Sequence, residues 1–223
     1  MELHRRKNLR LVVTNRQKEI LIGSLLGDAY ITRRGQIQFE QSTHQKEYLF
    51  WKKKELETIS YENVSFVKRL DKRYQKETNS YRFWTRQFFQ EWREEFYPNK
   101  KKVVPKNTQL TPLTLAVWYM DDGCLSDNRC IIATDGFCSN DIVFLQELLV
   151  SRYNIKSSLK NRSKIFIHKI SLQRFFAIID PYIIQSMRYK VFDPVTTSRK
   201  RDVDQTKISI TRQYPDHLDK GIV

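Results

Sequence analysis

The chain has 223 residues, 40% of them hydrophobic, and its 40 Lys and Arg against 25 Asp and Glu give a formal charge of +15. This composition supports a packed core and indicates a polyanionic partner such as nucleic acid. No run approaches the ~18 apolar residues of a membrane span, and no signal peptide or lipidation motif is visible, so we expect a soluble protein with no membrane partner. Cys124, Cys130 and Cys138 offer no zinc-ligand set, which favours a reducing, intracellular compartment.

The first half of the chain predicts a series of helices and strands. After a basic arm at residues 1–13, the run Thr14-Asn15-Arg16-Gln17 fits a capping box that starts a helix ending near Gly27. Further along we expect strands within residues 29–41, a helix over 45–59, a basic hairpin over 64–85 with its turn at 75–79, and a short aromatic helix over 88–96 that Pro98 ends.

The second half repeats this order. Thr111 and Pro112 fit the N-cap and first position of a helix. It is followed by a predicted strand at 129–134, a helix at 141–152, a hairpin from 155–159 and 164–170, and a helix at 172–179. We therefore predict a duplicated unit, with a first subdomain and its N-terminal arm at 1–98, a linker at 99–110, a second subdomain at 111–192 and a polar tail at 193–223.

The helix that opens each unit is apolar and ends in an acid. The first reads Leu21 to Asp28, and the second reads Leu115 to Asp122 and Gly123. An acid at a helix C-terminus opposes the helix dipole, and a buried unpaired charge costs several kcal/mol, so two such ends call for an explanation. If the helices pack together, the carboxylates converge and repel each other unless a cation lies between them. Mg²⁺, for which Mn²⁺ may be exchanged, accepts oxygen ligands and substrate phosphates, and this arrangement suits phosphodiester hydrolysis.

These two stretches resemble the signature motifs of single-chain LAGLIDADG homing endonucleases over roughly residues 14–192. The resemblance implies an α+β fold of two pseudo-twofold αββαββα subdomains, each with a curved antiparallel sheet, packed through the motif helices. It implies a monomeric, intron-encoded enzyme that cuts double-stranded DNA at a long asymmetric site and leaves short 3′ overhangs. Asp28 and Asp122 match the metal-binding acids, with Gly27 and Asp121 beside them; Asp121 is interpreted as a surface or packing residue whose backbone carbonyl can assist the metal.

Four further residues are candidates for the catalytic centre by this resemblance. Lys102 and Lys190 match the basic residue that family members place near each active centre. Gln41 and Asp135 each lie 13 residues past an acid (41 − 28 and 135 − 122) and are expected to position water. Alternatively, each lysine is an ordinary phosphate contact.

The motif helices depart from the family pattern in an informative way. Gly23 and Gly27 form a strip without side chains on one helix, whereas Val117 and Asp121 occupy positions where small residues are expected on the other. We therefore expect an asymmetric interface in which the glycine strip accepts the bulkier side chains.

Long polar side chains on the predicted strands are candidates for reading bases, because a two-stranded ribbon fits the major groove. Many of them are expected to bind phosphates instead. The candidates are Arg33, Gln36, Gln38, Glu40, Lys68, Arg69, Arg73 and Arg82 in the first half, and Arg129, Lys156, Lys160, Arg162, Lys164 and His168 in the second. Trp51, Trp84, Trp92 and Trp118 are expected in the core or at an interface.

Two other functions fit the same fold. One is an RNA maturase that assists splicing of intron RNA, and the other is a DNA-binding regulator that does not cleave. Retention of both acids argues against the regulator, because a binding protein has no need for converging carboxylates. The sequence does not distinguish a mitochondrion or plastid from a prokaryotic cytoplasm.

Overall fold

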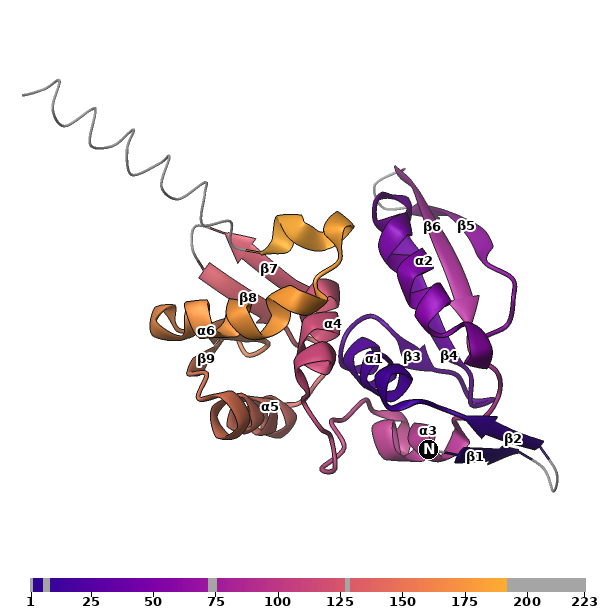
Figure 1. Ribbon diagram of the computed structural model, residues 1–223, viewed down its shortest axis with the longest axis horizontal. Coiled ribbons are helices and arrows are strands. Elements are labelled where there is room, and N and C mark those ends of the chain that lie inside the picture. Colours follow the sequence, from indigo (N-terminus) through magenta and orange to yellow (C-terminus); the bar gives the residue numbers. More distant parts are fainter. Residues whose placement is uncertain (1, 6–8, 72–75, 127–128, 192–223) are drawn as a thin grey trace, which may run out of the picture. The chain divides into compact units, whose positions relative to one another are not determined.

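The computed structural model describes residues 2–5, 9–71, 76–126 and 129–191, and residues 1–191 form one compact unit (Figure 1). The predicted polar tail and Arg73 lie outside the described residues. No helix in the described part of the chain has the length and apolar character needed to cross a bilayer.

The first αββαββα unit contains a four-stranded antiparallel sheet in the order β3-β4-β6-β5. Its elements are α1 (Asn15–Leu26), β3 (Tyr30–Ile31), β4 (Ile37–Ser42), α2 (Lys46–Glu55), β5 (Ser65–Asp71), β6 (Lys76–Trp84) and α3 (Gln90–Phe96). Short 3₁₀ turns at Thr43–Gln45, Glu57–Ile59 and Pro98–Lys100 join them.

The second unit repeats the order of elements, and its sheet runs β7-β8-β10-β9. It contains α4 (Pro112–Asp122), β7 (Gly123–Ser126), β8 (Arg129–Ala133), α5 (Ser139–Tyr153), β9 (Ser157–Lys160), β10 (Lys164–Ile167) and α6 (Lys169–Ile179), followed by 3₁₀ turns at Asp180–Tyr182 and Gln185–Lys190. The predicted duplication is therefore confirmed.

Local sequence signals place the starts of both motif helices correctly. At α1, Gln17 N donates to Thr14 Oγ1 and Thr14 N donates to Gln17 Oε1, each at 3.1 Å, which completes the capping box. At α4, Thr111 Oγ1 accepts from Thr114 N at 3.2 Å, and Pro112 opens the helix.

Three sequence predictions need correction. Residues 1–13 are not merely an arm, because β1 (Glu2–Arg5) and β2 (Leu9–Val12) pair as an antiparallel hairpin. Strand β6 begins at Lys76, so it includes residues expected in the turn. The last expected strand also runs too far, because His168 N-caps α6 and residues 169–170 are helical.

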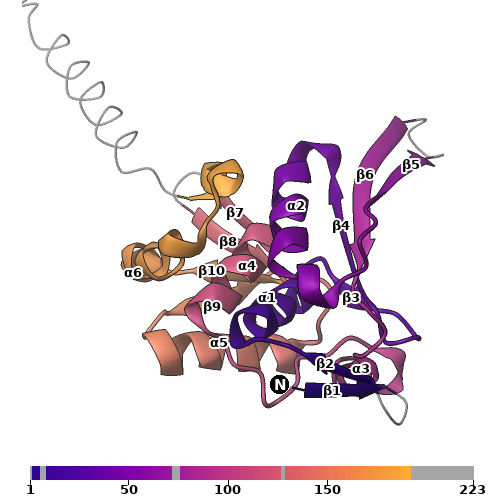
Figure 2. The same cartoon turned by 45° about the vertical axis from the view of Figure 1, so that its right-hand side comes forward.

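One face of the first sheet packs on α2, and the other face is not covered by that helix (Figure 2). Phe39 and Phe83 stack on the covered face with ring centroids 4.6 Å apart. Because side chains alternate along a strand, Gln38, Glu40 and Arg82 point to the opposite, outer face. Trp118 and Trp92 are buried, whereas Trp51 and Trp84 are half-buried.

The two halves meet where α1 packs against α4 (Figures 1 and 2). A Cβ atom on Gly23 would lie 2.8 Å from Val117 Cβ, and one on Gly27 would lie 2.4 Å from Asp121 Cβ. Both distances are too short for non-bonded carbon atoms, so the glycines make room for the larger residues opposite them. The expected asymmetric helix interface is thus what the fold contains.

A buried ion pair closes this interface from the side of α2. Lys52 Nζ lies 2.7 Å from Asp121 Oδ1 and 2.9 Å from Oδ2, and the two side chains are only 1% and 0% exposed. Lys52 also lies 4.3 Å from the ring centroid of Tyr48, a cation–π distance. Asp121 is therefore a packing residue and not a surface residue.

The glycine contact predicts a large effect for a small substitution. Gly27→Ala should lower the free energy of unfolding by about 2–3 kcal/mol, because the added methyl group meets a Cβ atom that cannot rotate away. Gly136→Ala is the matched control: its nearest atom would be Lys102 Cδ at 3.6 Å, so its effect should stay within ~0.5 kcal/mol. Urea unfolding of both variants measures the difference, and equal stabilities would contradict the close approach of the helices.

The ion pair predicts a second stability effect. Lys52→Met should cost roughly 3–5 kcal/mol, because it leaves the Asp121 carboxylate buried and unpaired. Adding Asp121→Leu to Lys52→Met should recover much of this loss, since the buried charge is then removed. Lys54→Met, at an exposed position of the same helix, is the control. A Lys52→Met protein as stable as the Lys54→Met protein would show that the pair contributes little.

Candidate active site at the ends of α1 and α4

The two predicted acids lie at the paired ends of α1 and α4. Asp28 follows α1 and is exposed, whereas Asp122 is the last residue of α4 and is half-buried. Burial, together with the negative charges of Asp28 and Asp121, raises the pKa of Asp122 to about 7. Asp28 N also lies 3.4 Å from Asp121 Oδ2, which connects the ends of the helices. The fold therefore brings the two acids into one electrostatic neighbourhood.

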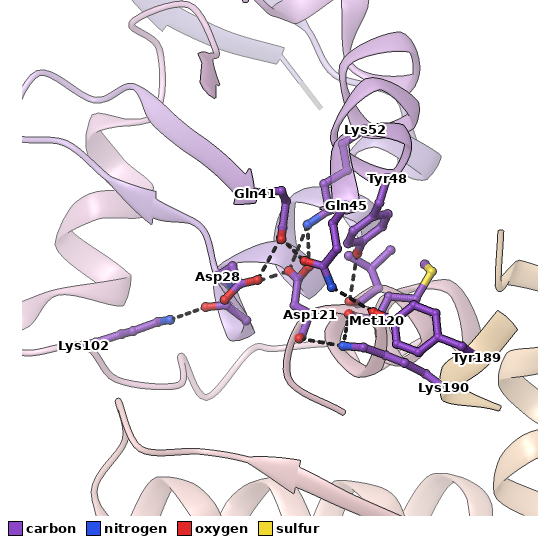
Figure 3. Close-up of polar contacts among 12 residues, drawn as sticks. Asp28, Gln41, Gln45, Tyr48, Lys52, Lys102, Met120, Asp121, Tyr189 and Lys190 are labelled. Atoms are coloured by element: carbon purple, nitrogen blue, oxygen red, sulfur yellow. Dashed lines mark hydrogen bonds and ion pairs between the residues drawn. The ribbon is translucent and has the colours of Figure 1, made fainter. Parts of the chain in front are cut away.

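The two predicted lysines bind the helix ends in matching ways (Figure 3). Lys102 Nζ donates to Gly27 O at 2.9 Å, and Lys190 Nζ donates to Asp121 O at 3.0 Å and to Met120 O at 2.6 Å. Each lysine thus contacts the carbonyl that precedes an acid. Burial lowers the pKa of both lysines, and the nearby acids oppose that shift. Since helix-terminal carbonyls have no partner within their helix, the lysines also satisfy these acceptors.

Gln41 joins the exposed acid to the buried one. Its Nε2 donates to Asp28 Oδ2 at 2.8 Å and lies 3.4 Å from Asp121 Oδ1 (Figure 3). Both neighbours are acceptors, so the amide nitrogen must face them. Burial raises the pKa of Asp121 to about 6, although Lys52 works in the opposite direction. Gln41, Asp28, Asp121 and Lys52 therefore form one connected network.

Strand register corrects the expected equivalence of Gln41 and Asp135. Tyr30 and Cys124 are equivalent, because each lies two residues past the acid of its motif. Tyr30 pairs with Gln38 in the first sheet, and Cys124 pairs with Ile131 in the second. The paired residues are thus eight positions apart in the first sheet (38 − 30) and seven in the second (131 − 124). Thr134 consequently takes the position of Gln41, and its Oγ1 donates to Ser163 O at 2.7 Å.

Asp135 itself is exposed and accepts a hydrogen bond from the Ser163 hydroxyl. The neighbouring loop lies beside Lys102, whose Nζ is 5.0 Å from the ring centroid of Phe137. Gly136 and Phe137, which follow Asp135, therefore lie against Lys102, and the expected role of Asp135 in positioning water stays a prediction.

Sequence reasoning missed several residues that support the site. Tyr48 OH donates to Val117 O at 3.2 Å, and Tyr119 OH donates to Lys190 O at 2.6 Å. Gln45 Nε2 donates to Tyr189 OH at 3.0 Å, next to Lys190. The available signal was the polar positions of Gln45, Tyr48 and Lys52 on one predicted helix, where spacings of three and four residues share a face.

The oxygen atoms around the acids fit a hard divalent cation. The described residues contain no group of three or more His, Cys, Asp and Glu side chains suited to a metal. They do offer two carboxylates, Asp28 and Asp122, beside the carbonyl oxygens of Gly27 and Asp121, each of which already accepts from a lysine and has one further lone pair. An all-oxygen set this small suits Mg²⁺, which usually retains waters and is completed by substrate phosphates.

The candidate DNA-reading residues fall into three groups in the first half. Arg69 and Arg82 reach Glu40 on the outer face of the sheet, where Gln38 lies beneath them. Lys68 lies on the opposite, helix-covered side, because its strand position alternates with Arg69 and its Nζ lies 6.0 Å from the ring centroid of Phe66. Lys68 is therefore not on the same face as Gln38, Glu40, Arg69 and Arg82.

The β3–β4 turn carries the third group. Arg33 is exposed there and lines an open hollow of about 350 Å³ with Arg93 and Lys100. Gln36 precedes β4, and its N donates to Thr32 Oγ1 at 3.2 Å.

The outer face of the second sheet has a different composition. Ile131, Ala133 and Phe166 occupy its centre, by alternation with the buried Cys130, Ile132 and Ile165. The charged candidates lie around these apolar residues: Arg129, Lys160 and Lys164 at strand ends, Arg162 in the β9–β10 turn, and Lys156 and His168 just outside β9 and β10. Lys160 Nζ lies 4.9 Å from the Phe166 ring centroid.

Comparison with known proteins finds a similar maturase and a similar DNA endonuclease. The chain is 33% identical over 195 residues to the cytochrome b mRNA maturase bI2 of Saccharomyces cerevisiae, covering 77% of this chain and 46% of the maturase. It is 30% identical over 212 residues to the DNA endonuclease I-ChuI of Chlamydomonas applanata, covering 81% of this chain and 96% of that enzyme. The chain thus spans less than half of the yeast maturase.

A solved structure and a family match complete the comparison. The homing endonuclease I-WcaI bound to its DNA recognition sequence superposes with a TM-score of 0.74 at 25% identity, covering 82% of this chain and 88% of that one. Residues 18–175, which include both motif helices, match the LAGLIDADG DNA endonuclease family. The chain is therefore a member of the LAGLIDADG DNA endonuclease family.

Proposed function

We propose that this chain is a divalent-metal-dependent endonuclease that cuts both strands of a long, asymmetric DNA site. The observation that carries the proposal is the matched pair of helix ends. Each end combines an acid, Asp28 or Asp122, with a lysine on the preceding carbonyl. A protein that only binds DNA has no need for two such constellations, because the half-buried Asp122, Lys102 and Lys190 are charged groups that lose part of their hydration.

The residues of the chain divide the work as follows. Asp28 and Asp122, with the carbonyls of Gly27 and Asp121, would hold Mg²⁺ or Mn²⁺, and the bound cation would acidify water and stabilise charge on the scissile phosphate and leaving oxygen. Lys102 and Lys190 stand beside the acids, where an ammonium group can approach a phosphate oxygen. Gln41 contacts Asp28 through its amide nitrogen, which leaves its carbonyl oxygen to orient water.

The paired arrangement accounts for double-strand cleavage by a single chain. Each motif helix ends in one acid with one lysine on the preceding carbonyl, so a monomer carries both sets of groups. We expect each acid to serve one strand, and the cuts to leave short 3′ overhangs. Asp135 remains a candidate for positioning water in the second half.

A maturase function is the second candidate. The observation in its favour is the 33% identity to a cytochrome b mRNA maturase. It predicts binding to structured intron RNA, whether or not DNA is also cleaved.

Substitution of the acids tests the endonuclease proposal. The 223-residue chain is incubated with a randomised duplex library and Mg²⁺, and the cut ends are sequenced. Asp28→Asn and Asp122→Asn should each lower the rate of double-strand cleavage by about 10³-fold or more, the order expected when an electrostatic catalyst is lost. Both variants should keep their affinity for DNA. Glu62→Gln, at an exposed loop position, is the control. Unchanged cleavage by either variant contradicts the assignment, and RNA binding without any DNA cleavage favours the maturase.

The acids also predict an unusual pH dependence of stability in chelator. The pKa values of Asp122 and Asp121 in the folded chain, about 7 and about 6, exceed the ordinary value of 3.8. At pH values between 3.8 and these raised values, the folded chain therefore binds more protons than the unfolded chain. The free energy of unfolding should therefore rise as the pH falls from 8 to 5, by roughly 2 kcal/mol.

Below that window the direction reverses. Glu40 has a pKa of about 2, so its contribution to stability is lost as the pH falls through the range from 4.5 toward 2. Urea unfolding at several pH values in EDTA measures both slopes, and Asp122→Asn should flatten the first. A stability that falls steadily from pH 8 to 5 contradicts the raised pKa values.

A further inference from the structure

The outer face of the first sheet contains a hydrogen-bond network that restricts what it can offer a base. Glu40 lies at its centre, on β4 between β3 and β6 in the sheet. Glu40 Oε2 accepts from Arg82 Nε at 2.7 Å and from Arg69 Nη2 at 3.0 Å, and Oε1 accepts from Arg69 Nη1 and from Ser80 Oγ at 2.6 Å. Both carboxylate oxygens are therefore occupied by protein donors, and the carboxylate is unable to accept from a cytosine amino group without losing one of them.

Gln38 is restricted in the same way. Its Oε1 accepts from Trp84 Nε1 at 3.2 Å and from Tyr30 OH at 2.9 Å, and its Nε2 lies 3.4 Å from Glu40 Oε2. An indole N–H can only donate and a carboxylate can only accept, so these neighbours fix which amide atom is oxygen. The bidentate contact by which glutamine reads adenine needs that oxygen. Gln38 is also only 9% exposed, so little of its side chain is accessible to a base.

Two arginines remain available on this face as donors. Arg82 binds Glu40 through Nε and Nη2, which leaves Nη1 to point elsewhere, and its guanidinium carbon lies 5.6 Å from the Trp84 ring centroid. Arg69 uses one edge of its guanidinium on Glu40, and its side chain is 52% exposed. Hydrogen bonds from the arginines and Ser80 hold the pKa of Glu40 at about 2 against the effect of burial, so the anchor stays ionised at neutral pH.

Guanine is the base whose major-groove edge carries two acceptors, N7 and O6, and arginine is its usual partner. We propose that Arg69 and Arg82 select guanine in the half-site facing the first sheet, and that Glu40 and Gln38 are positioning residues that hold these arginines and do not read bases themselves. This inference rests on the proposed binding of double-stranded DNA.

The second sheet supplies an internal control. Its outer face has Ile131, Ala133 and Phe166 at the positions of Gln38, Glu40 and Trp84, and Lys164, paired with Ala133, at the position of Arg82. Such a face has no carboxylate at the position of Glu40 to hold a planar guanidinium. The guanine dependence that requires Glu40-held arginines should therefore be confined to one half of the target.

The first experiment identifies the half-sites. Duplexes bound by the full 223-residue chain are selected from a randomised library and sequenced, so that binding without cleavage still gives a result. Arg82→Lys, which loses the planar fork, should relax base preference at a few positions of one half-site, and Lys164→Ala should leave those positions unchanged. If no duplex is enriched, both the proposed function and this inference fail.

The second experiment replaces the guanines at those positions with 7-deazaguanine, which lacks the N7 acceptor but keeps its pairing with cytosine. Affinity should fall roughly tenfold for each substituted contact in this half-site and change little in the other half-site. An unchanged affinity, combined with sensitivity to N4-methylcytosine on the opposite strand, would show that Glu40 reads cytosine and would overturn the inference.

The role of Glu40 is tested by a ratio, which a loss of folded protein does not alter. Glu40→Gln should reduce the preference for guanine over 7-deazaguanine by about tenfold, because the arginines lose their charged anchor. Glu40→Asp should restore part of the preference, since the charge is retained. A uniform loss of affinity for all duplexes, with the ratio unchanged, would make Glu40 a merely structural residue and contradict its positioning role.

Discussion

The close contact of α1 with α4 at Gly27 and Asp121 is the constraint on which the site depends. A glycine at the end of α1 lets the Asp121 side chain lie against the backbone, within 3.4 Å of Asp28 N. Asp121 is thereby enclosed, and an enclosed carboxylate needs a partner, which Lys52 of α2 supplies. The helix interface, the ion pair and the position of Asp28 are therefore parts of one packing solution.

This solution makes the two halves chemically unequal at corresponding positions. The residue before the acid is Gly27 in one motif and Asp121 in the other, and only the second brings a further negative charge to the centre. Asp28, held by Gln41, is exposed, whereas Asp122 is half-buried and its pKa is raised by burial and by its two acidic neighbours. The lysines, in contrast, make the same contact with the carbonyl before each acid. The two sites are therefore alike in their lysine contacts and differ in the surroundings of their carboxylates.

The sequence was sufficient for the parts of the fold that depend on local chemistry. The capping box at Thr14, the Thr111-Pro112 start and the glycine strip were predicted because neighbouring residues determine them. Counting along the chain failed where the two sheets differ in register: Tyr30 pairs with a residue eight positions later (38 − 30), whereas Cys124 pairs with one seven positions later (131 − 124). Thr134 and not Asp135 therefore matches Gln41. Lys52 was missed because its partner is 69 residues away and nothing in the helix around Lys52 identifies that partner.

The same limit applies to the DNA-reading residues. Strand alternation indicates which residues share a face, but it does not indicate which of them bind each other. Glu40 and Gln38 resemble base readers in the sequence, yet their acceptors are occupied by Arg69, Arg82, Trp84 and Tyr30 from neighbouring strands. The chemistry offered to a ligand by a polar face is thus what remains after its internal hydrogen bonds are formed. On this sheet the remaining groups are the positively charged N–H donors of the arginines. They agree with the charge excess of the whole chain and place part of it on the outer face of the first sheet.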